Sequence, residues 1–268
     1  MAFLRGLVRR AIGQPAGAAA PAQEPPAGPQ LDDLTYERLY EAHARAYPDE
    51  GGVGAVGEDD LFGQLELGLL RMEGLQPDQT LVDFGCGNGR LAMRAVPFLT
   101  GGRYIGIDIS ETFLGAAADK VSRIEPTPTC DVSWIRQPGT RFLLPDASAD
   151  WILAASVFTH MEHEDTYRYL VDARRIIRPG GRLVFTCLPL TLENARAIFE
   201  AEAAMDFGAR WGRVRCVATS VDLMNELAEM SGWTVLHWYA GDAVVLPSFT
   251  GDRYSMGQAI CVLEPGRS

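Results

Sequence analysis

Cysteine is sparse in this sequence, with five residues in 268 and no Cys-x-x-Cys spacing. The five are Cys86, Cys130, Cys187, Cys216 and Cys261. An odd number of widely separated thiols argues against a disulfide framework or a zinc site and is typical of a reducing compartment, so we expect a cytoplasmic protein without a metal centre. The sequence also lacks a run of about 18 apolar residues, the length that a membrane-spanning helix needs.

Positive charge is also in short supply. Asp and Glu number 35 against 24 Lys and Arg, which gives a formal net charge of -11. Nonspecific binding to nucleic acid depends on contacts between basic side chains and phosphates, so this balance disfavours a nucleic-acid partner. Hydrophobic residues make up 47% of the chain, which is enough for a sizeable core.

The first thirty residues differ from the rest of the chain. Residues 1–13 place apolar side chains at helical spacing with arginines between them, and residues 14–30 are rich in Pro, Ala and Gly. The former are either a short amphipathic helix lying on an anionic membrane surface or a poorly ordered start, and the latter are predicted to be a flexible linker. We therefore predict one domain over residues 31–268, in the cytoplasm or peripheral at the inner face of a membrane.

Beyond residue 31, short apolar runs alternate with amphipathic segments. Strands are predicted at 80–84, 103–107, 132–136, 151–155, 182–187, 233–239 and 258–263. Helices are predicted at 35–47, 59–73, 89–99, 111–121, 164–177, 192–206 and 220–231. This alternation is typical of a doubly wound α/β domain, with a mostly parallel sheet and helices on both faces.

A glycine-rich turn follows the first predicted strand in "LVDFGCGNGRLAMR", residues 81–94. A strand, a tight turn and a helix start together let a ligand approach the backbone closely. The spacing of Gly85, Gly87 and Gly89 is G-x-G-x-G, whereas a dinucleotide site needs G-x-G-x-x-G and a Walker loop needs Gly-Lys. Asp83 suits an ammonium group better than a pyrophosphate. The other interpretation is a tight turn that binds nothing.

A second carboxylate ends the next strand, in "YIGIDIS". Asp108 can accept two hydrogen bonds from a ribose diol at this position, or it can be an ordinary acidic residue near a helix start. Ser110 is predicted to cap the following helix.

Four motifs in this order, "LVDFGCGNGRL", "YIGIDIS", "SVFTHM" and "ARRIIRPGGRLVF", resemble those of class I S-adenosylmethionine-dependent methyltransferases over about residues 60–190. The resemblance implies a seven-stranded sheet whose last strand is antiparallel. It implies that the turn cradles the methionine end of S-adenosyl-L-methionine, with Asp83 near the amino group and Asp108 at the ribose. The predicted cofactor-binding residues are Asp83, Gly85, Cys86, Gly87, Asn88, Gly89, Arg90, Asp108, Ile109, Gln137 and Ser156.

One position departs from the family pattern. Many members have an acidic residue after the third strand that binds the adenine amino group, but here the strand continues into Pro138-Gly139. The amide oxygen of Gln137 can take its place, with Phe142 or Leu143 beside the ring. Gln137 can equally be a solvated strand end.

The methyl transfer point is expected after the fourth strand, in "AASVFTHMEHED". Alignment of the nucleophile with the methyl group and exclusion of water are the main requirements. A hydroxyl acceptor also needs a general base, for which His160 is the candidate; its alternative role is a scaffold at the start of the next helix.

Acceptor choice is expected to come from the less regular segments 35–60, 188–218 and 240–257. Trp211 and the arginines around it can recognise an acidic or sugar-like acceptor, or they can simply pack and be solvated. The leading hypothesis is O-methylation of a small-molecule, glycan or lipid-linked acceptor. N-methylation of an amine or protein, and a catalytically silent partner subunit that binds the cofactor, remain alternatives.

Overall fold

The structure is a computed structural model that describes residues 35–46 and 56–266. The predicted amphipathic segment 1–13, the linker 14–30 and most of the glycine-rich segment 49–60 lie outside the described residues. The proposed boundary between residues 30 and 31 therefore remains a prediction. Among the described residues, no helix has both the length and the apolar character needed to span a bilayer.

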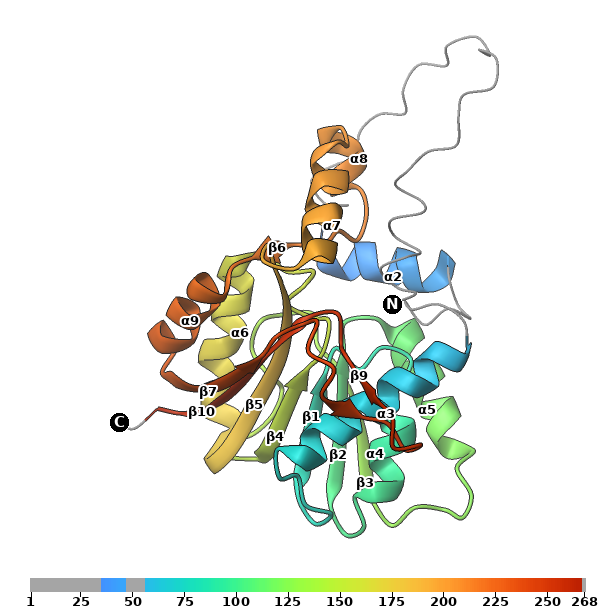
Figure 1. The fold of residues 1–268 in the computed structure, drawn as a ribbon. Helices are drawn as coiled ribbons and strands as arrows, with labels where there is room; N and C mark the ends of the chain where they lie inside the picture. The colour runs from blue at the N-terminus through green and yellow to red at the C-terminus, as the bar shows by residue number, and fades with distance from the viewer. Residues whose placement is uncertain (1–34, 47–55, 267–268) are drawn as a thin grey trace.

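One twisted sheet forms the centre of the molecule (Figure 1). Its strands are β1 (Thr80–Phe84), β2 (Arg103–Asp108), β3 (Asp131–Arg136), β4 (Ala149–Ala154), β5 (Ile177–Pro189), β6 (Ala218–Thr219), β7 (Trp233–Tyr239) and β10 (Ala259–Pro265). The spatial order is β3-β2-β1-β4-β5-β10-β7. Strands β1 to β5 pair in parallel, whereas β10 runs antiparallel to both β5 and β7. The predicted doubly wound sheet with its antiparallel last strand is confirmed.

Short strands add to this plan. The two-residue β6 pairs with the end of β5, and a separate hairpin joins β8 (Leu246–Pro247) to β9 (Arg253–Tyr254). Strand β5 begins earlier than predicted, at Ile177, because Ile177 already pairs with Ala149 before the register shifts. The sheet is therefore eight-stranded, with a seven-strand path that matches the expectation.

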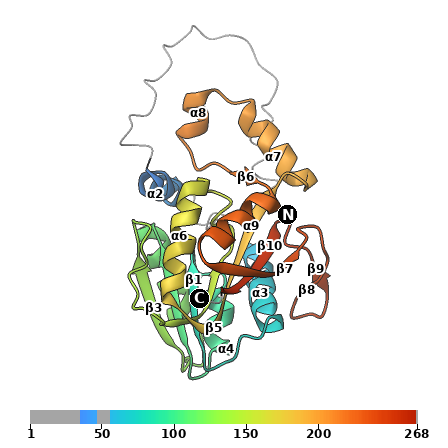
Figure 2. The ribbon, with the colours of Figure 1, turned by 90° about the vertical axis from the view of Figure 1, so that its left-hand side faces the viewer.

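Helices cover both faces of the sheet (Figures 1 and 2). They are α2 (Tyr36–Ala46), α3 (Val56–Met72), α4 (Ala92–Phe98), α5 (Glu111–Ser122), α6 (His163–Ile176), α7 (Glu193–Ala203), α8 (Phe207–Trp211) and α9 (Val221–Met230). Helices α3, α4 and α5 lie on one face, and α6 and α9 on the other. The helix predicted at 192–206 ends at Ala203, and α8 begins after a break at residues 204–206.

The strands contribute to two cores because successive side chains point to opposite faces. Val82 and Ile105 lie in the cluster that packs against α6 and α9. Their neighbours Leu81 and Tyr104 lie in the cluster formed with α3 and α4. Both pairs are nearly inaccessible to solvent, so the β1–β2 region is a rigid platform for the loops that follow it.

The strand order reverses at β1, whose neighbours are β2 on one side and β4 on the other. In open α/β sheets, ligands bind beside the carboxyl ends of the strands at such a switch point. The loops after β1, β2 and β4 meet there, and α2, α7 and α8 lie beyond the same edge (Figure 1).

Candidate cofactor and acceptor site

The turn after β1 needs glycine for two physical reasons. Gly85, Gly87 and Gly89 have φ of +74°, +52° and +86°, in the left-handed region that side chains disfavour. Added Cβ atoms would also collide, at 2.4 Å from Val157 Cγ2 for Gly85 and 2.9 Å from Ala117 Cβ for Gly89. The backbone of the turn therefore lies close to its neighbours without intervening side chains.

Asp108 connects this turn to the end of β2. Its Oδ2 accepts a hydrogen bond from the backbone N–H of Gly87 at 2.9 Å, and its Oδ1 accepts one from Ser110 at 2.9 Å. Burial raises the pKa of Asp108 to about 6, against the lowering effect of these N–H donors. Each carboxylate oxygen can accept a further bond, so the group can hold hydroxyl donors while remaining fixed in position.

Asp83 is the second buried carboxylate near the turn. It is 4% exposed, and its Oδ2 accepts a 2.5 Å hydrogen bond from the hydroxyl of Tyr104. Burial, followed by the nearby charge of Glu66, raises the pKa of Asp83 to about 7. A cation binding beside this carboxyl would favour its ionised form.

Arg90 lies at the junction of the turn with α3. Its Nη2 is 2.6 Å from Oε1 of the buried Glu66, and its guanidinium lies 5.6 Å from the Phe62 ring centroid. A Cβ on Gly63 would come within 2.4 Å of the Arg90 carbonyl oxygen, so α3 packs closely on the turn. Arg90 thus anchors α3, and its predicted contact with the cofactor stays a prediction.

The remaining residues predicted around the turn are mostly buried. Asn88 and Cys86 are each 5% exposed, and Ile109 is partly exposed. Burial raises the pKa of the Cys86 thiol, so the group is a neutral, apolar wall at neutral pH.

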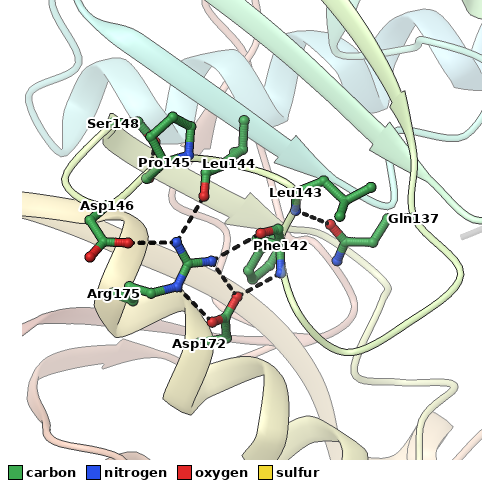
Figure 3. A network of polar contacts seen from close by, with 9 residues as sticks. All are labelled: Gln137, Phe142, Leu143, Leu144, Pro145, Asp146, Ser148, Asp172 and Arg175. Atoms are coloured by element: carbon green, nitrogen blue, oxygen red, sulfur yellow. Dashed lines mark hydrogen bonds and ion pairs between the residues drawn. The ribbon is translucent and has the colours of Figure 1, made fainter.

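Gln137, predicted to bind adenine, is 2% exposed and turned inward rather than solvated. Its backbone N–H donates to the Asp108 carbonyl at 3.0 Å, and its side-chain Oε1 accepts from the Leu143 N–H at 3.1 Å (Figure 3). The amide oxygen therefore shapes the loop after β3. Leu143 itself is 63% exposed, whereas Phe142 is buried against Phe84 and Tyr169.

A polar network from α6 holds the same loop (Figure 3). Asp172 accepts the Phe142 N–H at 2.6 Å, and Arg175 donates to the carbonyls of Phe142 and Leu144 at 2.9 and 2.8 Å. Arg175 also forms ion pairs with Asp172 and Asp146. The hydrogen bonds fix the backbone around Phe142, which lies beside Gln137.

Ser156 follows β4 in a left-handed conformation, with φ of +59°. Its N–H donates to Thr186 Oγ1 at 2.7 Å, and its hydroxyl accepts from Gln258 Nε2 at 2.9 Å. Such strain in a non-glycine residue is retained where surrounding contacts determine it, and it is common at functional sites. Gln258, which was not predicted from the sequence, connects Ser156 to β5, because its Oε1 accepts a hydrogen bond from Thr186 Oγ1.

His160 is 8% exposed, and its Nδ1 lies 2.8 Å from the Arg215 carbonyl oxygen. A carbonyl only accepts, so Nδ1 carries the proton and the imidazole lone pair is on Nε2. Burial lowers the pKa of His160 to about 4, and the ring is therefore neutral near pH 7. The ring centroid of Tyr40 lies 6.3 Å away in an edge-on arrangement.

Helix α2 crosses the carboxyl edge of the sheet, a role that its sequence did not reveal. At one end of the crossing, Glu41 accepts hydrogen bonds from the hydroxyls of Ser110 and Thr112 at 2.6 and 2.5 Å. At the other, the Tyr36 hydroxyl accepts the Glu162 N–H at 2.9 Å. Helix α2 thus joins the loop after β2 to the loop after β4, directly beside the predicted cofactor and transfer positions.

The site therefore combines a glycine-rich turn, two buried carboxylates and a neutral histidine along one sheet edge. The two carboxylates can bind an ammonium ion and a diol, and the histidine lies at the same edge in the loop after β4.

Comparison with known proteins gives a family match over part of the chain. Residues 82–185 match the family described as a methyltransferase domain. Over 140 residues the chain is 30% identical to 27-O-demethylrifamycin SV methyltransferase from Amycolatopsis mediterranei, covering 52% of this chain and 50% of that protein. Demethylmenaquinone methyltransferase from Tropheryma whipplei is 32% identical over 114 residues, 42% of this chain and 44% of that protein.

Solved structures share the fold over most of the chain. Magnesium protoporphyrin IX methyltransferase from Synechocystis, determined with bound SAH, has a TM-score of 0.58 and 18% identity, with 88% of this chain and 97% of that chain covered. The matched segments span half or less of the curated relatives' own lengths. Over residues 82–185 the chain is nevertheless similar to methyltransferase domains, and its fold is that of S-adenosylmethionine-dependent methyltransferases.

Proposed function

We propose that the chain is an enzyme that transfers a methyl group from S-adenosyl-L-methionine to an acceptor oxygen. The observation that carries this proposal is the pair of buried carboxylates, Asp83 and Asp108, on either side of the glycine turn. Burial raises the pKa of both groups, to about 7 and about 6. A ligand that offers an ammonium group and two hydroxyl donors at once would stabilise both as anions.

The residues fit the two ends of this cofactor. Asp83 would hold the amino group, Asp108 would accept the ribose hydroxyls, and the turn 85–89 would admit the chain between them. Gln137 would lie at the adenine end, and Ser156 near the transfer point. When bound, the cofactor supplies an electrophilic sulfonium methyl group. The chain's own residues would align an acceptor oxygen with this methyl group, exclude water and provide a base for the acceptor proton.

His160 has two proposed roles in this reaction. Its lone pair on Nε2 can accept the acceptor proton, but a pKa of about 4 makes it a weak base. Its bond to the Arg215 carbonyl instead favours a role in holding the segment before α9 against the loop after β4. If His160 is the base, His160→Ala lowers kcat by roughly 10²- to 10⁴-fold and alters the pH profile with cofactor affinity intact. Near-normal turnover would refute that role.

The acceptor is proposed to be a small molecule, including a glycan or a lipid-linked compound, with residues 1–13 as a peripheral membrane contact in the lipid case. The name of one relative, 27-O-demethylrifamycin SV methyltransferase, indicates methylation at an oxygen. This likeness favours an oxygen acceptor for the present chain. The alternative is N-methylation: the 1,6-didemethyltoxoflavin-N1-methyltransferase of Burkholderia thailandensis has the same fold, with a TM-score of 0.58 and 16% identity. A silent cofactor-binding subunit is the non-enzymatic alternative.

Methyl-labelled S-adenosyl-L-methionine tests the proposal directly. The purified chain is incubated with label and with lipid, glycan, protein and small-molecule fractions of a cell extract. We expect the label in one fraction. Asp108→Asn should lower the amount of transferred label at least about tenfold, because a neutral amide is a poorer hydrogen-bond acceptor for the ribose hydroxyls. Asp131→Asn, at the exposed opposite edge of the sheet, is the matched control and should keep full transfer. Cofactor binding without transfer to any fraction would favour the silent subunit.

A further inference from the structure

The chain between β5 and α9 forms an arm beyond the carboxyl edge of the sheet (Figures 1 and 2). We call residues 205–217 the α8 arm. Its last residues return to the transfer loop, where the Val217 N–H donates to the Thr159 carbonyl at 2.7 Å and His160 Nδ1 bonds to the Arg215 carbonyl. The arm is therefore attached beside the position at which the acceptor would react.

Positive charge gathers on this arm, although the chain as a whole carries a net charge of -11. Arg210, Arg213 and Arg215 lie within six residues of one another. The Arg215 side chain is 20% exposed, and its guanidinium stacks 4.2 Å from the Trp211 ring centroid and pairs with Glu162. Stacking fixes the plane of the guanidinium, so its N–H donors point in set directions that suit a planar or tetrahedral oxyanion.

Two neighbouring donors on the arm lack acceptors. Arg210 Nε and the indole Nε1 of Trp211 are both buried and have no hydrogen-bond partner in the described part of the chain. Arg213, by contrast, lies 3.6 Å from Glu202, whereas Arg210 forms no ion pair with any described residue. Both orphan groups can only donate, and a buried donor without an acceptor destabilises the structure that holds it. The missing partner is therefore an oxygen acceptor, and the uncompensated charge of Arg210 favours an anionic one.

We propose that the α8 arm binds an oxyanion of the methyl acceptor, a carboxylate or a phosphate, through Arg210, Trp211 and Arg215. This inference rests on the proposed methyl transfer and narrows its substrate class. The acceptor would be a hydroxylated compound that carries an anionic group away from the oxygen that receives the methyl.

Three small aromatic probes test the site without knowledge of the acceptor. Ligand-observed NMR titrations of the full chain use benzoate, phenyl phosphate and benzamide, which match in ring size but differ in charge. We expect at least one anion to bind about tenfold more tightly than neutral benzamide, because charge-assisted bonds to buried donors are the stronger ones. The tighter of the two anions assigns carboxylate or phosphate. Arg210→Gln should abolish the preference, whereas Arg123→Gln, an exposed arginine at the far end of α5, should keep it.

The inference is overturned if benzamide binds as tightly as both anions, if neither anion binds saturably, or if Arg210→Gln retains the preference. Calorimetry with S-adenosyl-L-methionine on the same samples separates the two proposals. If the unmodified chain binds S-adenosyl-L-methionine but shows no preference for the anions, this inference alone is overturned. If the unmodified chain does not bind S-adenosyl-L-methionine, the proposed function itself is overturned.

Discussion

Cofactor binding is expected to release a proton from the site near pH 6.5. Asp83 and Asp108 have pKa values raised to about 7 and about 6, so in the free protein they are about 0.75 and 0.25 protonated at pH 6.5. An ammonium group beside Asp83 and hydroxyl donors to Asp108 favour the ionised carboxylates and lower both pKa values. If both fall well below 6.5, about one proton leaves for each cofactor bound.

Isothermal titration calorimetry measures this proton directly. The observed enthalpy is recorded at pH 6.5 in buffers of different ionisation enthalpy, and the slope of one against the other is the number of protons released. At pH 8 the two carboxyls are already ionised, and a free α-amino group with a pKa near 8 must take up protons to bind as ammonium. The release should therefore fall to about zero or reverse sign at pH 8.

Single substitutions measure how much of the proton release comes from each carboxyl group. Asp83→Asn should reduce the release at pH 6.5 to about 0.25, and Asp108→Asn to about 0.75, because each leaves only the other carboxyl to ionise. Asp131→Asn should leave about one proton. A slope of zero at pH 6.5 in the unmodified protein would contradict this expectation, since it would mean that no buried carboxyl changes its protonation when the ligand binds.

The same pKa shift has a consequence for stability. Burial raises the pKa of Asp83 from an ordinary value of 3.8, so the folded state favours the protonated form more than the unfolded chain does. The stabilisation from this group is full below about pH 4 and is lost as the pH rises through about 7. With cofactor bound, the free energy of unfolding should no longer fall as the pH rises through about 7, because the ammonium group favours the ionised form of Asp83.

Three further outcomes are expected. Gly85→Ala should destabilise the fold by roughly 1–3 kcal/mol in urea unfolding and weaken cofactor binding, because its Cβ would lie 2.4 Å from Val157 Cγ2 at a positive φ; unchanged stability would contradict this. Hydrogen bonds hold the pKa of Glu41 at about 2, so Glu41→Gln should speed hydrogen exchange in α2 above pH 4.5 but not near pH 2; equal rates throughout would oppose it. Arg175→Lys should raise KM for the cofactor more than it lowers kcat, because lysine cannot hold Asp172 and the loop carbonyls together; an unchanged KM would exclude that role.

The parts of the site that follow buried strands could be predicted from the sequence. Asp83 and Asp108 lie at strand positions that apolar runs define, and Gly85 and Gly89 stand where only glycine fits. These features depend on local backbone geometry, so a short window of sequence carries them. The parallel sheet is likewise predictable, because each strand alternates with a helix of sufficient length to cross over.

Contacts between distant segments could not be predicted in this way. Glu41 and Arg45 have the i, i+4 spacing of a solvated helix face, yet Glu41 bonds to Ser110, 69 residues away. Gln258 lies 102 residues from Ser156 and gives no local signal. The two-residue strands β6, β8 and β9 are too short for an alternating pattern.

The choice between S-adenosyl-L-methionine and NAD is the property of the glycine turn that decides the proposed function. The purified chain is titrated by calorimetry with S-adenosyl-L-methionine and, separately, with NAD. We expect saturable one-to-one binding of S-adenosyl-L-methionine that is weakened by Asp108→Asn. We expect no binding of NAD, because G-x-G-x-G spacing with Asp83 before the turn suits an ammonium group and not a pyrophosphate. Binding of NAD with no binding of S-adenosyl-L-methionine would contradict it.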